Sequence, residues 1–140
     1  MGVSIRYIGS VRVLYCNVSN PSLFPLSHIA TQTKISGKIK KYKDGSFLSP
    51  HNHMIIENEE PNYKYFSLAY YIDDGNPDET HTFNGCVSFQ VNQKLFNIRP
   101  KPGLLLIWES HLIHNVNPFF SKNGQERMML SANIICIPNK

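Results

Sequence analysis

The segment RPKPGLLLIWESHLIHNV, residues 99–116, contains a turn, an apolar run and a histidine within a short length of chain. Pro102 and Gly103 turn the chain into residues 104–108, which are all apolar and are typical of a buried β-strand. A short reversal then leads to His114. The segment therefore predicts two successive strands, with a histidine on the second.

Similar runs recur along the chain. β-branched and aromatic residues, often alternating with polar ones, occupy residues 5–16, 34–43, 64–72, 86–91, 95–98, 104–108 and 127–137. Turn clusters such as KDGS, DDGNPDE and SKNG separate them. No segment has a sustained helical period, although residues 20–33 are compatible with a short turn of helix. The pattern predicts an all-β jelly roll of about seven or eight strands with little helix.

Length and charge set the broad class of the protein. With 140 residues, the chain is expected to form one domain over residues 1–140. Its formal net charge is +4, but the basic residues are spread out and cluster only in KIKKYK, residues 38–43. We interpret this cluster as a solvated strand face, which argues against a nucleic-acid partner.

The cysteines and the N-terminus indicate where the protein works. Cys16, Cys86 and Cys136 lie far apart in apolar surroundings, so we predict buried reduced thiols rather than disulfides or a metal site. Arg6 and Arg12 interrupt the apolar N-terminal residues, which excludes a signal-peptide core, and no apolar stretch reaches transmembrane length. The expected setting is the cytoplasm, with no membrane partner.

Two histidines, His51 and His53, are separated by a single residue. Side chains on a strand alternate between faces, so both imidazoles would lie on one side at a spacing suited to one metal ion. The pair alone is equally compatible with two partly exposed, hydrogen-bonding histidines. His114 on the opposing strand would complete a triangle around a transition metal and leave positions open for a co-substrate and oxygen.

An arginine begins the final apolar run. Period two places Arg127, Met129, Ser131 and Asn133 on one face of that strand. If this face is the inner one, the planar guanidinium is suited to bind a carboxylate in two-point fashion, and the site would hold a dicarboxylate. The alternative is that Arg127 is a solvent-facing residue at the start of the strand.

Four motifs follow one another along the chain. They are YKDGSFLSPHNH at residues 42–53, LAYYIDD at 68–74, RPKPGLLLIWESHLIHNV at 99–116 and QERMMLSANI at 125–134. This order resembles the iron(II)- and 2-oxoglutarate-dependent oxygenases. More narrowly, it is similar to the short prolyl-hydroxylase-like members of cyanophages and marine bacteria, over about residues 36–137.

The resemblance implies a double-stranded β-helix, cupin-like, with the metal at one mouth of the barrel. It implies that His51 and His114 hold Fe(II), and that Tyr71, Arg127 and Ser131 bind the distal carboxylate of 2-oxoglutarate. The implied activity is hydroxylation of a substrate by O2, with oxidative decarboxylation of 2-oxoglutarate to succinate. The resemblance leaves the substrate open, and the setting is the host cytoplasm if the chain is phage-encoded.

The second ligand position departs from the family pattern. Most members have aspartate or glutamate there, whereas this chain has His53. We expect His53 to bind as a third imidazole; the alternatives are Glu57 as the carboxylate, or two histidines with water or halide. His111 is a weaker choice than His114, and His28 and His81 lie in polar loop contexts. Asp73 and Asp74 are expected to shape a turn at the end of a strand.

Two other readings compete with the oxygenase. The spacing of Gly45, His51, His53 and Glu57 also fits the first metal motif of cupins that do not use 2-oxoglutarate. In the second cupin motif a histidine follows the turn glycine closely, whereas here a whole strand separates Gly103 from His114, which favours the oxygenase. The other is a non-catalytic β-barrel with a structural or interaction role. Little sequence remains beyond the barrel to cover strand edges, which is consistent with a homodimer.

Overall fold

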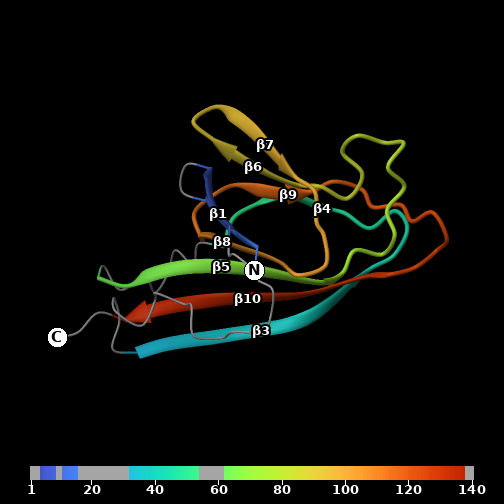
Figure 1. The fold of residues 1–140 in the computed structure, drawn as a ribbon. Coiled ribbons are helices and arrows are strands. Elements are labelled where there is room, and N and C mark those ends of the chain that lie inside the picture. The colour runs from blue at the N-terminus through green and yellow to red at the C-terminus, as the bar shows by residue number, and fades with distance from the viewer. Residues whose placement is uncertain (1–3, 9–10, 16–31, 54–61, 138–140) are drawn as a thin grey trace.

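The structure, a computed structural model, describes residues 4–8, 11–15, 32–53 and 62–137. Within these ranges the chain is all-β (Figure 1). Its strands are β1 (Ser4–Ile8), β2 (Val11–Tyr15), β3 (Gln32–Tyr42), β4 (Leu48–His51), β5 (Lys64–Asp73), β6 (Val87–Val91), β7 (Lys94–Ile98), β8 (Leu104–Glu109), β9 (His114–Val116) and β10 (Arg127–Ile137).

The strands form two antiparallel sheets that lie one above the other (Figure 1). The larger sheet has six strands in the order β1-β2-β8-β5-β10-β3, and the smaller has four in the order β4-β9-β6-β7. β10 pairs along its whole length with β3 on one side, and with β5 on the other. The chain crosses repeatedly between the sheets, which is the jelly-roll arrangement that the sequence predicts.

The core lies between the two sheets. Leu104, Leu106 and Trp108 of β8 are buried in it, together with Phe89 of β6 and Tyr71 of β5. The intervening residues of β8 are buried as well, which explains why its sequence is a continuous apolar run rather than an alternating one. This central strand leads directly into the turn that precedes His114.

The number of strands is larger than the sequence predicts. The structure has ten strands among its described residues, because the run over residues 5–16 forms a hairpin of β1 and β2 rather than a single strand. β4 and β9 are only four and three residues long, too short to carry a visible alternation. These two short strands nevertheless carry the histidines of the candidate site.

Other expectations have mixed outcomes. Cys86 and Cys136 are buried and free, as predicted, whereas Cys16 lies outside the described residues. Most of the segment expected to contain a helical turn, residues 20–33, also lies outside them. Its last two residues begin β3. Over the described residues, the structure has no helix that is long and apolar enough to cross a membrane.

Candidate metal centre

Three histidines meet where the short strands β4 and β9 pair. His51 is the last residue of β4 and lies directly opposite His114, the first residue of β9. His53 lies beyond the end of β4, so the expectation that it shares a strand with His51 is wrong in detail. Its backbone N–H donates to the Ser110 carbonyl at 2.9 Å, which returns its side chain to the same place.

The ring nitrogens of this histidine cluster converge on one point. One nitrogen from each of His51, His53 and His114 lies within 4.8 Å of the others. The Nε2 atoms of His53 and His114 are 3.2 Å apart. Two ligand nitrogens at right angles around a divalent metal, with bonds of about 2.1 Å, are separated by about 3.0 Å. The His53 and His114 pair therefore has the spacing of two ligands of one metal ion, and the His51 nitrogen lies close enough to be a third after a small adjustment.

Backbone carbonyls fix the orientation of two of the rings. Nδ1 of His51 lies 2.7 Å from the Ser49 carbonyl, and Nδ1 of His114 lies 3.0 Å from the Leu112 carbonyl. A carbonyl can only accept, so each Nδ1 carries the proton and donates it. Each Nε2 is left with a free lone pair, which is the form in which imidazole binds metals.

Burial favours the neutral form of two of the three imidazoles. It lowers the pKa of His114 to about 4, with the nearby imidazoles acting in the same direction and a hydrogen bond to Leu112 opposing it. Burial likewise lowers the pKa of His53. Neutral imidazoles at neutral pH are ready to bind a cation without first losing a proton.

Aromatic side chains enclose one side of the cluster. The Trp108 ring meets the His114 ring edge-on at a centroid distance of 4.9 Å, and the Phe89 ring stacks against His114 at 5.8 Å. The indole N–H of Trp108 is buried and has no acceptor among the described residues. The cavity beside the cluster is lined by Lys40, Tyr42, Leu48, Ala69, Tyr71, Val87, Trp108, Val116, Met129 and Ser131, with the three histidines.

Arg127 is buried, so the alternative of a solvent-facing arginine is wrong. Its side chain is only 1% exposed, and its Cζ lies 4.4 Å from the centre of the Phe119 ring. Nη1 donates to the Gly85 carbonyl at 2.6 Å and Nε to the Asp74 carbonyl at 3.3 Å. Nη2 is buried without an acceptor among the described residues. A buried cation with a free donor and no ion pair among the described residues is suited to bind an anion.

The predicted site residues differ in whether they line the cavity beside the histidine cluster. Tyr71 and Ser131 line the same cavity as the histidine cluster, whereas Arg127 is not among the residues that line it. Tyr71 and Arg127 still interact electrostatically: Tyr71 raises the pKa of Arg127, against the larger effect of burial, which lowers it. Burial raises the pKa of Tyr71, so its hydroxyl stays protonated.

Lys40 is a wall residue that the sequence interpretation missed. We expected residues 38–43 to form a solvated strand face, but Lys40 is half-buried and lines the cavity of the histidine cluster. Burial and the neighbouring Lys38 lower the pKa of Lys40. The signal was present in the strand period, because Lys40 and the core residue Tyr42 are two positions apart on β3.

The remaining candidates are not among the described residues of the histidine cluster. His111 is exposed and its Nε2 lies 3.5 Å from a carboxylate oxygen of Glu109, and His81 is also exposed. Glu57 and His28 lie outside the described residues. Asp73 and Asp74 shape the turn after β5, as expected: Asp73 accepts from the Gly75 N–H at 2.8 Å and Asp74 from the Asn76 N–H at 3.1 Å.

The sequence matches a known family over most of its length. A sequence model of the 2OG-Fe(II) oxygenase superfamily matches residues 37–135, which include all three histidines and Arg127. The chain belongs to the 2OG-Fe(II) oxygenase superfamily. Members of this superfamily use Fe(II) and 2-oxoglutarate, as its name states. A search among curated proteins finds no match.

Solved structures of 2OG-Fe(II) oxygenases have the same fold. A prolyl-4-hydroxylase from Pseudomonas putida is 18% identical with a TM-score of 0.58, over 76% of this chain and 54% of its own. A prolyl hydroxylase from Trichoplax adhaerens, solved with a hypoxia inducible factor peptide, is 16% identical with a TM-score of 0.56. The match covers 75% of this chain and 44% of that protein. At these identities the likeness shows the fold alone. The chain spans about half the length of these proteins.

The residues present fit the groups that the superfamily uses. Three imidazole nitrogens that face one point could hold iron(II), which accepts nitrogen ligands readily. The unpartnered Nη2 of Arg127 is the kind of donor that a carboxylate of 2-oxoglutarate would satisfy. The jelly-roll fold expected from the sequence is confirmed, and the histidine cluster could hold the metal.

Proposed function

We propose that the protein is an Fe(II)- and 2-oxoglutarate-dependent oxygenase that hydroxylates a substrate while 2-oxoglutarate is decarboxylated to succinate. The observation that carries the proposal is the convergence of three ring nitrogens, with Nε2 of His53 and His114 only 3.2 Å apart, in a chain of this superfamily. When bound there, iron(II) with 2-oxoglutarate would supply the activation of oxygen.

His51, His53 and His114 would hold the metal as neutral ligands. A carboxylate in place of His53 would cancel part of the metal's charge, whereas three imidazoles leave it uncompensated until an anion arrives. We therefore infer that 2-oxoglutarate strengthens metal binding more here than in a site with a carboxylate ligand. The backbone contacts of His51 and His114 hold their rings in the required orientation.

Tyr71, Arg127 and Ser131 would bind the distal carboxylate of 2-oxoglutarate. Arg127 offers a charge and a free N–H, Tyr71 a protonated hydroxyl, and Ser131 a second hydroxyl on the cavity wall. The packed side chains of Trp108 and Phe89 would exclude water from the metal on the side of His114. Exclusion of water protects reactive species during the reaction.

Equilibrium dialysis under anaerobic conditions tests the proposal. We expect the protein to bind iron(II) and 2-oxoglutarate one to one, and His114→Ala to lose both. His111→Ala is the matched control and should bind both normally, because the His111 ring pairs with Glu109 away from the cluster. Metal binding without 2-oxoglutarate binding would instead favour a cupin-type metalloprotein, and binding of neither would favour a non-catalytic barrel.

The proposed partners are 2-oxoglutarate, O2, a substrate and a second copy of the chain. The homodimer is supported by β3, which is an edge strand eleven residues long. Ile35 and Ile39 on its outer face are 67% and 54% exposed. Pairing of two such edges would satisfy backbone groups and cover these side chains.

A further inference from the structure

The inner face of β3 carries a row of lysines that leads away from the histidine cluster. Tyr42 of this strand is buried in the core and Lys40 lines the cavity of the cluster. Since side chains alternate along a strand, Lys38 and Lys34 lie on the same face as Lys40, and both are exposed. We refer to Lys34, Lys38 and Lys40 as the lysine row.

Polar side chains of β10 and β5 lie beside the lysine row. The register places Ser131 opposite Lys38, and Asn133 opposite Ser36. The Ser67 hydroxyl of β5 donates to Oδ1 of Asn133 at 3.3 Å. The described residues of this inner face on β3, β10 and β5 include no aspartate or glutamate before the turn that begins at Asp73. The row is therefore a cationic, hydrogen-bonding surface next to the candidate metal centre.

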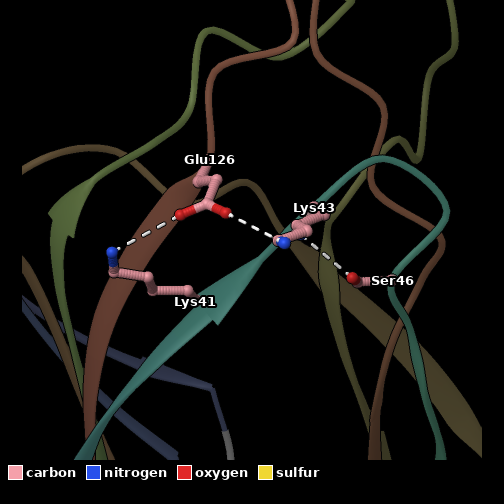
Figure 2. Close-up of polar contacts among 4 residues, drawn as sticks. All are labelled: Lys41, Lys43, Ser46 and Glu126. Atoms are coloured by element: carbon pink, nitrogen blue, oxygen red, sulfur yellow. Dashed lines mark hydrogen bonds and ion pairs between the residues drawn. The ribbon is translucent and has the colours of Figure 1, made fainter.

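The outer face of the same strand is different. Figure 2 shows Glu126 between Lys41 and Lys43, with ammonium-to-carboxylate distances of 3.5 and 3.7 Å. Glu126 thus neutralises Lys41 and Lys43, on the outer face of β3 and just beyond its end. The lysines of the inner face have no such partner among the described residues.

The charge of the site explains what the lysine row requires. A metal dication held by neutral imidazoles and the ammonium of Lys40 would share one cavity, and like charges at short range repel unless an anion lies between or beside them. Of the two carboxylates of 2-oxoglutarate, one would bind the metal and the other Arg127. Lys38 and Lys40 would remain available for a further anion.

We propose that the substrate is anionic, and that Lys40 and Lys38 bind its carboxylate or phosphate group and so direct the rest of the molecule toward the metal. This inference rests on the proposed function, because it takes the lysine row as part of the substrate site of that oxygenase. Carboxylate and phosphate share the chemistry that two adjacent ammonium groups recognise.

The test uses inorganic phosphate and acetate as separate probes. Each is titrated into protein loaded with zinc and 2-oxoglutarate, which is inert, while backbone amide signals are followed by NMR. We expect saturable shifts along residues 36–40 and 131–133. Lys40→Gln and Lys38→Gln should each weaken binding at least about fivefold, as expected for a lost charge-assisted contact. Lys41→Gln is the matched control and should bind like the wild type, because Lys41 lies on the outer face.

Three results would overturn the inference. One is no saturable binding of either probe. Another is an equal loss in Lys41→Gln, which would indicate diffuse attraction by net charge. The third is anion binding that 2-oxoglutarate abolishes, which would assign Lys40 to the co-substrate. The probe that binds more tightly distinguishes a carboxylate substrate from a phosphate.

A titration of metal-free protein separates this inference from the proposed function. Probe binding that depends on Lys38 and Lys40, in a protein that fails to bind zinc and 2-oxoglutarate, would support the anion site and refute the oxygenase. Normal binding of zinc and 2-oxoglutarate with no probe binding would refute the anion site and leave the oxygenase standing.

Discussion

At the scale of single residues, the burial of His114 determines how the metal-free protein responds to acid. Its side chain is 4% exposed and its pKa is lowered to about 4, from an ordinary value of 6.5. The unfolded chain therefore binds more protons than the folded chain between these two pH values, so the free energy of unfolding falls as pH drops through this window. The contribution lost by pH 4 is about 3 kcal/mol.

Urea unfolding of metal-free protein at about pH 7 and about pH 4.5 measures this loss. The free energy of unfolding should be lower at about pH 4.5 than at about pH 7 in the wild type. We expect this decrease to be smaller by about 2 kcal/mol in His114→Gln, because that variant lacks the buried imidazole. His111→Gln, which changes an exposed imidazole, should keep the wild-type pH dependence. An equal fall in all three proteins would contradict the burial of a neutral His114.

Arg127 is expected to determine affinity for the co-substrate and not for the metal. Arg127→Met keeps most of the side-chain volume and removes the guanidinium, so 2-oxoglutarate affinity should fall at least about tenfold while iron(II) affinity is unchanged. Titration calorimetry under anaerobic conditions measures both. Arg99→Met is the control, because Arg99 also has a buried Nη1 without a described partner, but its guanidinium donates to the Thr82 carbonyl, whereas that of Arg127 donates to Gly85 and Asp74 and interacts with Tyr71. Unchanged 2-oxoglutarate affinity in Arg127→Met would refute the assigned carboxylate site.

Sequence alone predicted some of the side chains that gather at the site and missed others. Strand alternation and the order of motifs selected His51, His114 and Arg127, and the structure brings the three histidines together and buries Arg127. The same alternation should have identified Lys40, but its clustering with other lysines suggested a solvated face. The proton positions on the imidazoles could not be predicted, because they depend on carbonyls of Ser49 and Leu112 whose direction only the fold defines.

At the scale of elements, the turn before β6 holds Arg127 in place. Gly85 has a φ of +60°, and a Cβ there would overlap the guanidinium, lying 2.8 Å from Nη1. Its carbonyl accepts from the same Nη1. A glycine at this position thus allows the backbone to approach the buried arginine closely.

Gly85→Ala is expected to displace Arg127 and weaken 2-oxoglutarate binding. Gly45→Ala is the matched control, because Gly45 has a φ of +80° but no atom within 4 Å of an added Cβ. Both variants should lose about 1–2 kcal/mol of unfolding free energy from backbone strain, measured by urea unfolding. Only Gly85→Ala should lose more than this and bind 2-oxoglutarate less tightly. Similar behaviour of the two variants would contradict the close packing around Arg127.

The elements differ in how well sequence predicts them. β5, β8 and β10 are long or continuously apolar and stand out as strands. β4 and β9 are defined by pairing with each other and, for β9, with β6, rather than by their own composition. Strands at His51 and His114 are expected from the histidine spacing and the turn at residues 102–103, but their short length and their pairing depend on long-range contacts, which a local pattern does not contain. Sequence therefore predicts that the two strands exist better than it predicts where they end.

At the scale of the whole molecule, the exposed edge of the larger sheet predicts self-association. β3 is its last strand, and Ile39 on the outer face is 54% exposed. We expect sedimentation to report a homodimer that Ile39→Lys converts to a monomer, because a charge in the paired edge opposes association. Lys34→Gln, on the opposite face of the same strand, should remain dimeric. A wild-type monomer at high protein concentration would contradict the proposed dimer.

The central claim is that one metal and 2-oxoglutarate meet at the histidine cluster. It is tested most directly by adding iron(II), and then 2-oxoglutarate, to metal-free protein without oxygen while recording the visible spectrum. We predict a weak metal-to-ligand charge-transfer band that needs both additions and is absent in His114→Ala. Bound iron with no such band after 2-oxoglutarate is added would contradict the claim.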